Sequence, residues 1–270
     1  MKIRLVLFLA AAIVAVAGCG GGSGSRGSDP ASLAPPKSPL FIEAVVQPEG
    51  ELKSNVEALA KRLGVADLGG LIVSKLESSA SSSGEELDFE KEVEPWLGEK
   101  GGLFFQQYDG KDFKGYGIAV QTTDPAASQG FIGKQAKSSE EPFKDGSYEG
   151  VDYKSQGDGT TVGVVGDFVA IAEDAKTFKA MVDASNGESL ADEDTYASTV
   201  DAAPSGSFAK VFVDVGGLIA QSGGSVDPEA KQFLDSAGID PSEATAVASL
   251  IPGSDQVEID VSTDLGGESP

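Results

Sequence analysis

The residue types that most often carry covalent, redox or metal chemistry are nearly absent from this chain. It contains one cysteine, Cys19, and no histidine. Ser-His-Asp and Cys-His catalysis both need an imidazole, so neither mechanism is available. A single cysteine cannot form a disulfide within the chain, and ordinary zinc sites draw on Cys and His ligands. The sequence therefore predicts no cofactor and no such metal, and leaves carboxylate chemistry to consider.

Carboxylates are abundant, with 43 Asp and Glu residues. A glycosidase needs two of them at a fixed separation in a cleft, and calcium prefers clustered carboxylate oxygens. Glu85-Glu86, Glu140-Glu141 and Asp192-Glu193-Asp194 lie in polar stretches, which favours a solvated surface, although weak calcium binding at the last group stays open. Asp109-Gly110-Lys111-Asp112 lacks the ligand pattern of an EF-hand loop and is better explained as a turn.

Ser207 and Lys210 have the Ser-x-x-Lys spacing of serine–lysine acyl enzymes. Those enzymes need the serine at a helix start, so that a residue three positions later lies on the same face. We expect a strand here, in which positions three apart point to opposite faces. The companion Ser-Asp-Asn and Lys-Thr-Gly motifs are also missing. We interpret the match as chance and predict no catalytic residue.

The cysteine ends a pattern that indicates a different role. Lys2 and Arg4 precede an apolar run, Leu5 to Ala17, and small residues lead to the cysteine in Val16 to Cys19. This layout resembles the lipobox signal of bacterial lipoproteins. The resemblance implies that the cysteine sulfur is lipidated, that residues 1–18 are a signal peptide that is removed, and that the protein is anchored on the outer, extracytoplasmic face of a bacterial cell membrane. The alternative is a transmembrane helix, but the apolar run has about 13 residues where about 20 are needed.

Residues 19–39 begin with the lipidated Cys19 and continue in Gly, Ser, Pro and Ala, which predicts a flexible tether reaching about 25 Å. Gly22 to Gly27 in this stretch has the spacing of a dinucleotide-binding loop but lacks the required strand and helix around it. The formal net charge of −23 predicts repulsion from nucleic acid and from anionic headgroups. Contact with the membrane is therefore expected through the acyl chains on Cys19 alone.

Residues 40–203 are predicted to form a first α+β unit, an antiparallel sheet of hairpins with helices packed on it. The expected strands are Phe41 to Val46, Gly102 to Phe105, Gly117 to Val120, Tyr148 to Ser155, Thr161 to Val165 and Phe168 to Ala172. The helices are expected to start near Leu52, Leu68, Asp88, Asp124 and Asp174. Trp96 is expected in the core, because a Trp buries a large area.

Residues 204–270 are predicted to form a second, shorter or truncated α+β unit that shares the sheet. Two weak internal echoes indicate this: Phe208 to Val215 resembles Phe41 to Gln47, and Ile251 to Thr263 resembles Trp96 to Tyr108. Leu218 and Ile219 should lie on a helix that follows the first strand. Two further helix starts are predicted, because Asp227-Pro228 and Asp240-Pro241 each place a capping carboxylate before a first-turn proline.

Four short segments carry a family likeness. They are Phe41 to Gln47, Pro95-Trp96-Leu97-Gly98, Tyr148-Glu149-Gly150-Val151 and Val165-Gly166-Asp167-Phe168-Val169. Together they are similar to an uncharacterised family of bacterial envelope proteins, the domain-of-unknown-function 3352 family. None of the four is a catalytic signature, so the resemblance implies a fold and an envelope location and no activity.

We therefore expect a non-enzymatic, lipid-anchored envelope protein that works as a binding or scaffolding module. One alternative is a carrier of an apolar or lipid ligand in a groove between sheet and helices, and the other is a carboxylate-dependent hydrolase. The carrier is suggested by apolar residues on both faces of two strands, namely Leu103, Phe104, Phe105, Phe113, Tyr116, Ile118 and Val120. Continuous apolar strands are usually covered on both faces, so we favour burial of these residues over a groove.

Overall fold

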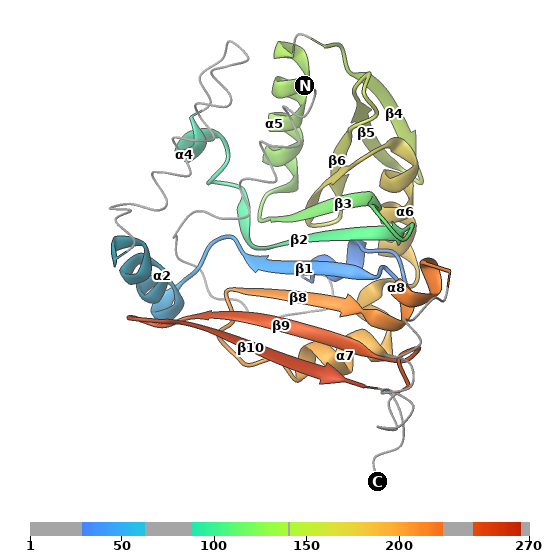
Figure 1. Ribbon diagram of the computed structural model, residues 1–270. Coiled ribbons are helices and arrows are strands. Elements are labelled where there is room, and N and C mark those ends of the chain that lie inside the picture. The colour runs from blue at the N-terminus through green and yellow to red at the C-terminus, as the bar shows by residue number, and fades with distance from the viewer. Residues whose placement is uncertain (1–28, 63–87, 140, 224–239, 266–270) are drawn as a thin grey trace.

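The computed structural model describes residues 29–62, 88–139, 141–223 and 240–265, and these fold around one antiparallel sheet of ten strands (Figure 1). In chain order the strands are β1 Leu40–Val45, β2 Leu97–Tyr108, β3 Phe113–Thr122, β4 Lys144–Tyr148, β5 Val151–Ser155, β6 Thr161–Val165, β7 Phe168–Ala172, β8 Ala209–Asp214, β9 Thr245–Pro252 and β10 Val257–Asp264. Their order across the sheet is β10-β9-β8-β1-β2-β3-β7-β6-β5-β4. The predicted α+β class and the shared antiparallel sheet are confirmed.

Helices and 3-10 turns (η) pack on this sheet. They are η3 Pro30–Leu33, α2 Gly50–Arg62, α4 Phe89–Glu92, α5 Pro125–Ser138, α6 Ala175–Asn186, η4 Leu190–Asp192, α7 Asp194–Asp201 and α8 Val215–Gln221. The carboxylates of Asp88, Asp124 and Asp174 accept hydrogen bonds from first-turn N–H groups, as their N-cap positions predict. Asp124 is followed by a proline at the first helical position, which fixes the start of α5. The predicted starts near Leu68 and at Asp227 lie outside the described residues.

The sheet contains the same arrangement twice. Three neighbouring strands, β1-β2-β3, lie on one side of the β1–β8 boundary, and β8-β9-β10 lie on the other. In each set the first strand is followed in the chain by a helix, α2 or α8, and later by a hairpin. β1 and β8 pair antiparallel with Phe41 opposite Phe212. The two sets therefore repeat the same order of elements outward from the β1–β8 pair, in agreement with the echo between the strands that contain these two residues.

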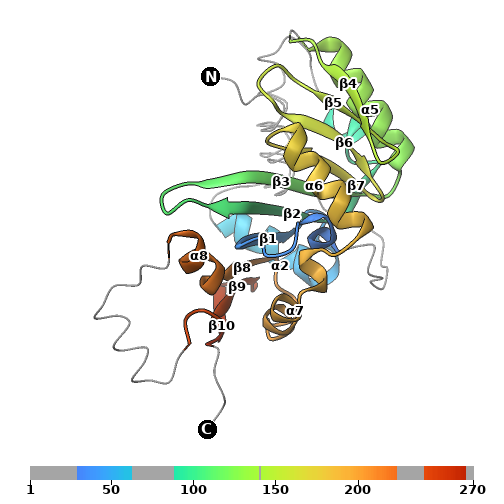
Figure 2. The same cartoon turned by 90° about the vertical axis from the view of Figure 1, so that its right-hand side faces the viewer.

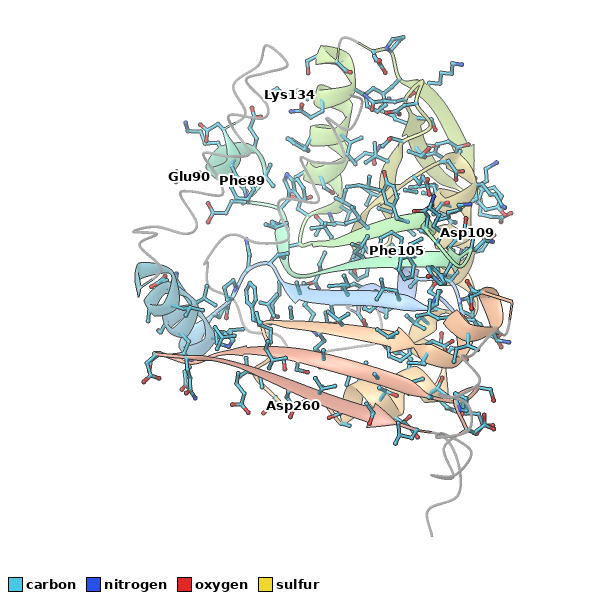
Figure 3. The ribbon with its side chains drawn as sticks, in the orientation of Figure 1. Phe89, Glu90, Phe105, Asp109, Lys134 and Asp260 are labelled. Carbon is cyan, nitrogen blue, oxygen red and sulfur yellow. The ribbon has the colours of Figure 1, made fainter. Side chains whose placement is uncertain are left out.

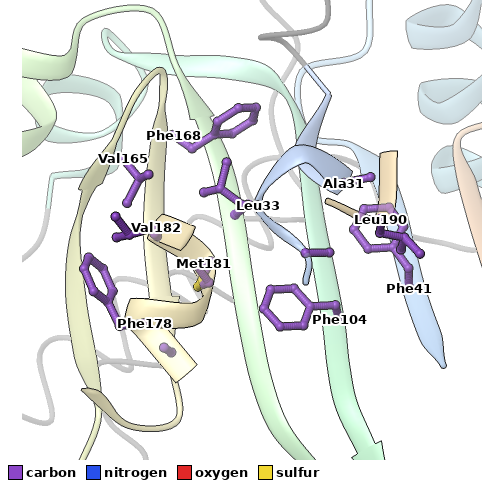
Figure 4. Close-up of a cluster of buried hydrophobic side chains, with 14 of the residues drawn as sticks. Ala31, Leu33, Phe41, Phe104, Val165, Phe168, Phe178, Met181, Val182 and Leu190 are labelled. Atoms are coloured by element: carbon purple, nitrogen blue, oxygen red, sulfur yellow. The ribbon is translucent and has the colours of Figure 1, made fainter. Parts of the chain in front are cut away.

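One face of the sheet is closed by η3, η4, α6 and α7. Its core contains Phe41 and Phe104 from adjacent strands, with Phe178 and Met181 of α6 (Figure 4). Phe212 of β8, directly opposite Phe41, belongs to the same core. Figure 2 shows α7 and α8 on opposite sides of β8 and β9, so α7 lies on this closed face and α8 on the other. Phe212, Phe41 and Phe104 are directly opposite one another and form a row across β8, β1 and β2.

The opposite face is covered at the β3–β7–β6 end by α4, α5 and the segment around Trp96. Trp96 is buried, as predicted, with its ring 5.5 Å from that of Phe131. Its indole N–H donates to the carbonyl of Glu92 (2.6 Å), and its own carbonyl accepts from the Thr122 hydroxyl (2.9 Å). Trp96 therefore joins the end of α4 to the end of β3 and closes the second core, which also contains Ile132.

The predicted tether is wrong for its C-terminal part. Residues 29–39 belong to the folded domain: Asp29 caps η3, and Ala31, Leu33 and Ala34 are buried in the closed face. The Ala34 carbonyl also accepts from the N–H of Leu190 (2.9 Å). Small and proline residues suggested a tether because they carry no hydrophobic periodicity, yet small residues are what a tight position between a sheet and its helices accepts.

Two further predictions are corrected. Tyr148 to Ser155 is not one strand but the β4–β5 hairpin, with positive φ angles of 49° at Glu149 and 81° at Gly150 in its two-residue turn. Asp240-Pro241 starts no helix; the Asp240 carboxylate accepts from the N–H (2.9 Å) and hydroxyl (2.6 Å) of Ser242, and β9 begins soon after. An Asp before a Pro opens turns as readily as helices, and the apolar β9 sequence favours a strand.

Candidate functional site

Those candidate residues that the structure describes occupy separate elements: Asp109 follows β2, Asp192 ends η4 and Lys210 lies in β8. Cys19, Glu85, Glu86 and Glu140 lie outside the described residues. Within the described ranges, no three Asp, Glu, Cys or His side chains gather in a way that would hold a metal ion. None of the helices in these ranges combines the length and apolar character that a membrane crossing requires.

The remaining acidic groups have structural roles. Asp192 accepts from the N–H (3.1 Å) and hydroxyl (2.8 Å) of Ser189 at the start of η4, and Glu193 occupies the N-cap position of α7. The Asp192 carboxylate therefore helps to start η4, whereas the Glu193 side chain makes no capping hydrogen bond to α7. Ser207 donates its hydroxyl to the carbonyl of Pro204 (2.7 Å) and precedes β8, the strand that contains Lys210.

Asp109 closes the turn between β2 and β3, as its sequence predicted. Its carboxylate accepts from the N–H groups of Asp112 (2.9 Å) and Lys111 (3.1 Å) and pairs with Lys114. The N–H of Asp112, the Lys114 ammonium and the N–H of Lys111 lower the pKa of Asp109 to about 2, because all three favour the ionised form. The carboxylate thus stays charged through the physiological range and fixes the hairpin tip (Figure 3).

The residues that suggested a ligand groove are mostly used in the two cores. Phe104 is fully buried on the closed face, whereas Ile118 and Val120 are buried in the other core. Phe113 is 38% exposed, and its ring lies 5.2 Å from that of Phe105 and stabilises the hairpin tip. The expectation that these strands are covered on both faces is thus confirmed for their central residues.

An apolar row crosses the sheet from a buried end to an exposed end. The register places the following residues opposite one another on consecutive strands, from β6 to β10: Val162, Ile171, Ile118, Leu103, Ile42, Val211, Ala248 and Val261. Because residues directly opposite each other on paired strands project from the same face of a sheet, all eight share one face. Those on β6, β7 and β3 are buried, the next four are partly buried, and Val261 is 61% exposed. We call this set the apolar row.

The exposed end of the apolar row lies on β10, an edge strand of the sheet. Val257, Ile259 and Val261 are 41%, 68% and 61% exposed, and Leu265 directly after the strand is also exposed. Of the exposed large apolar side chains in the described ranges, Phe113 is the one found elsewhere. Exposed apolar side chains gathered in one place mark interaction surfaces more often than scattered ones do. This strand is the candidate functional site.

The other face of β10 is acidic. Glu258 and Asp260 alternate with the three apolar residues, and Figure 3 shows Asp260 on this outermost strand. Asp260 is opposite Ser249 of β9, which is opposite Lys210 of β8. The candidate site therefore has an apolar face and an acidic face.

The sequence contained part of the signal for this site. The alternation of apolar and acidic residues from Val257 to Val261 is typical of a strand, and nothing in it shows whether the strand lies inside the sheet or at its edge. Position in the sheet depends on pairing between segments far apart in the chain, such as β8 with β1, and local patterns do not report it.

The fold and site define an α+β protein built on one open antiparallel sheet with an exposed apolar edge. Residues 67–249 match the family model described as a protein of unknown function, DUF3352, and the chain belongs to this family. The family resemblance drawn from the four short segments is thus confirmed. Among solved structures, the chain is similar to the one titled "Structure of crystal form I of TP0453", with a TM-score of 0.43 and 10% identity over 90% of this chain and 80% of that one. Comparison with curated proteins gave no match.

Proposed function

We propose that this protein is a lipid-anchored, non-enzymatic binding module of the bacterial cell envelope, and that β10 is where a partner protein docks. The observation that carries the proposal is the exposure of Val257, Ile259 and Val261 on one edge strand. Three β-branched side chains in water on adjacent same-face positions are unfavourable unless a partner covers them, because each gains free energy on burial. The sequence, with no histidine and one cysteine, supports binding over catalysis.

The proposed attachment to the membrane depends on lipidation of Cys19. In a bacterial host we expect the full-length protein to partition into the detergent phase, and intact mass analysis to show residues 1–18 removed and a diacylglyceryl group on the cysteine. The variant Cys19→Ala removes the sulfur that accepts the lipid, so it should lose detergent partitioning and keep its signal segment. An unlipidated native protein with residues 1–18 attached would contradict the anchoring.

Docking at β10 is tested by photo-cross-linking in the living cell. A benzophenone amino acid at Ile259 should give a discrete adduct with an envelope protein, because that side chain points from the exposed face of β10. The same group at Glu149, exposed in the β4–β5 turn beside the other edge of the sheet, is the matched control and should give no such adduct. If positions 257, 259 and 261 all give no adduct, the binding function at this edge is wrong.

A further inference from the structure

We propose that the outer edge of β10 is a strand-addition site, at which an extended segment of a partner protein joins the sheet antiparallel to β10. The segment that fits has apolar residues alternating with Lys or Arg. This inference rests on the proposed function and specifies the chemistry of its partner. Strand addition supplies affinity through main-chain hydrogen bonds and specificity through alternate side chains.

The backbone groups of β10 that point away from β9 belong to the same residues whose side chains are exposed. The N–H of Gly253 donates to the carbonyl of Gln256 (2.8 Å), so this pair at the β9–β10 turn is hydrogen-bonded. In an antiparallel ladder, bonded and non-bonded pairs alternate. Val257, Ile259 and Val261 therefore direct their N–H and C=O groups away from β9. Pro252, which has no N–H, is opposite Val257, and a non-bonded pair needs no donor at this position.

The internal repeat shows what belongs beside this edge. β10 occupies the place in its three-strand set that β3 occupies in the other. The outer edge of β3 is filled by β7, five buried apolar residues from Phe168 to Ala172 that pair with it antiparallel. Within the described residues, no strand pairs with the equivalent edge of β10. An antiparallel strand from outside these residues would complete the second set as β7 completes the first.

The charged residues of β10 are all acidic, so they oppose pairing with another acidic strand and not with a basic one. Edge strands that stay unpaired are commonly short or carry Lys or Pro. β4, at the other edge, has five residues, begins with Lys144 and contains Gly146. β10 has eight residues without Lys, Pro or Gly, and its charged residues are Glu258, Asp260 and Asp264. The two edges therefore differ in the direction expected if β10 pairs and β4 does not.

The side chains of β10 determine the partner's composition. Apolar residues of the added strand would extend the apolar row beyond Val261, and the residues between them would face Glu258 and Asp260. Opposite charges on facing strands are stabilising and like charges are destabilising. A second copy of β10 would place the same two acids against each other, so self-pairing is disfavoured. The net charge of −23 also disfavours it.

The test uses the mature, lipidated protein in detergent and labelled nine-residue peptides. One peptide alternates Lys and Val, a second has the same composition in blocks, and a third alternates Glu and Val. Fluorescence anisotropy should show the alternating Lys–Val peptide binding at least tenfold more tightly than the blocked one. Equal affinity of the two would show attraction to an acidic surface without strand pairing, and would overturn the proposal.

Two variants make the test specific. The double variant Glu258→Lys with Asp260→Lys should weaken binding of the Lys–Val peptide at least tenfold. It should also allow the Glu–Val peptide to bind. Glu141→Lys with Glu188→Lys changes the net charge equally at exposed acids that lie in connections between other elements, and should leave both affinities within about twofold. An equal loss in the two double variants would contradict the site.

The backbone requirement is tested by Ile259→Pro. Because the N–H of residue 259 points away from β9, proline should remove a bond to the added strand and keep the β9–β10 ladder. Peptide binding should fall at least tenfold, with the far-UV circular dichroism spectrum unchanged. If light scattering shows a dimer that Ile259→Pro dissociates, the strand that pairs with β10 comes from a second copy of this chain and not from a partner protein. If position 259 cross-links a partner but the peptides do not bind, strand addition fails and the proposed function stands.

Discussion

A chain that begins at residue 40 is expected to lose cooperative folding, whereas one that begins at Asp29 should be as stable as the full-length protein. The first lacks η3, whose Leu33 is buried in the closed face with Phe41 and Leu190. It also lacks two backbone acceptors, the carbonyls of Ala34 and Pro39, which bond the N–H groups that start η4 and end β8. Urea unfolding followed by Trp96 fluorescence and near-UV circular dichroism measures both chains.

A single substitution gives the magnitude of this effect. Leu33→Ala should lower the free energy of unfolding by about 2–5 kcal/mol, because it leaves a cavity under a helix that cannot collapse fully. That is a large part of the roughly 5–15 kcal/mol by which domains are stable. Leu265→Ala removes the same atoms from an exposed site and should change the stability by about 0.5 kcal/mol or less. Equal effects of the two substitutions, or a stable chain starting at residue 40, would show that residues 29–39 act as a tether and do not stabilise the folded domain.

The misassignment of residues 29–39 shows where sequence patterns fail. Hairpins such as β6–β7 were predictable because a Gly-first turn pair separates two apolar runs, so the interaction is local. The position of η3 against the sheet, in contrast, depends on a residue far away in the sequence. A Cβ built on Gly102 of β2 would lie 2.7 Å from Pro30 and 2.9 Å from the ring of Phe41, so the missing side chain is what allows η3 to approach the sheet. A glycine some seventy residues away holds that information, and periodicity does not reveal it.

The candidate site was predictable to a similar, partial extent. The alternation of Val257, Ile259 and Val261 with acids is typical of a strand, and the absence of histidine excludes Ser-His-Asp triads. The exposure of the strand follows from the order of all ten strands, which depends on β8 pairing with β1 across more than 160 residues. Local sequence reports which residues share a face, and long-range pairing decides whether that face is covered.

Phe212→Ala is expected to lower the free energy of unfolding by about 3–5 kcal/mol in one transition that includes the whole sheet. Phe212 is buried, with its ring 5.0 Å from that of Tyr196, which in turn lies 5.8 Å from the ring of Phe41. These three rings join β8, α7 and β1, so removing one creates a cavity where the two three-strand sets meet.

Trp96 fluorescence tests whether the sheet unfolds as one unit, because Trp96 lies in residues 40–203 whereas the substitution Phe212→Ala lies in residues 204–270. If the sheet unfolds as one unit, the Trp96 fluorescence transition should move to lower urea by the same amount as the far-UV circular dichroism transition. Phe113→Ala, at a ring that is 38% exposed, is the control and should cost about 1 kcal/mol or less. A Trp96 transition that stays in place while the circular dichroism signal splits would mean that the two sets fold independently. The edge at β10 would then belong to a separate domain, and strand addition there would stabilise residues 204–270 alone.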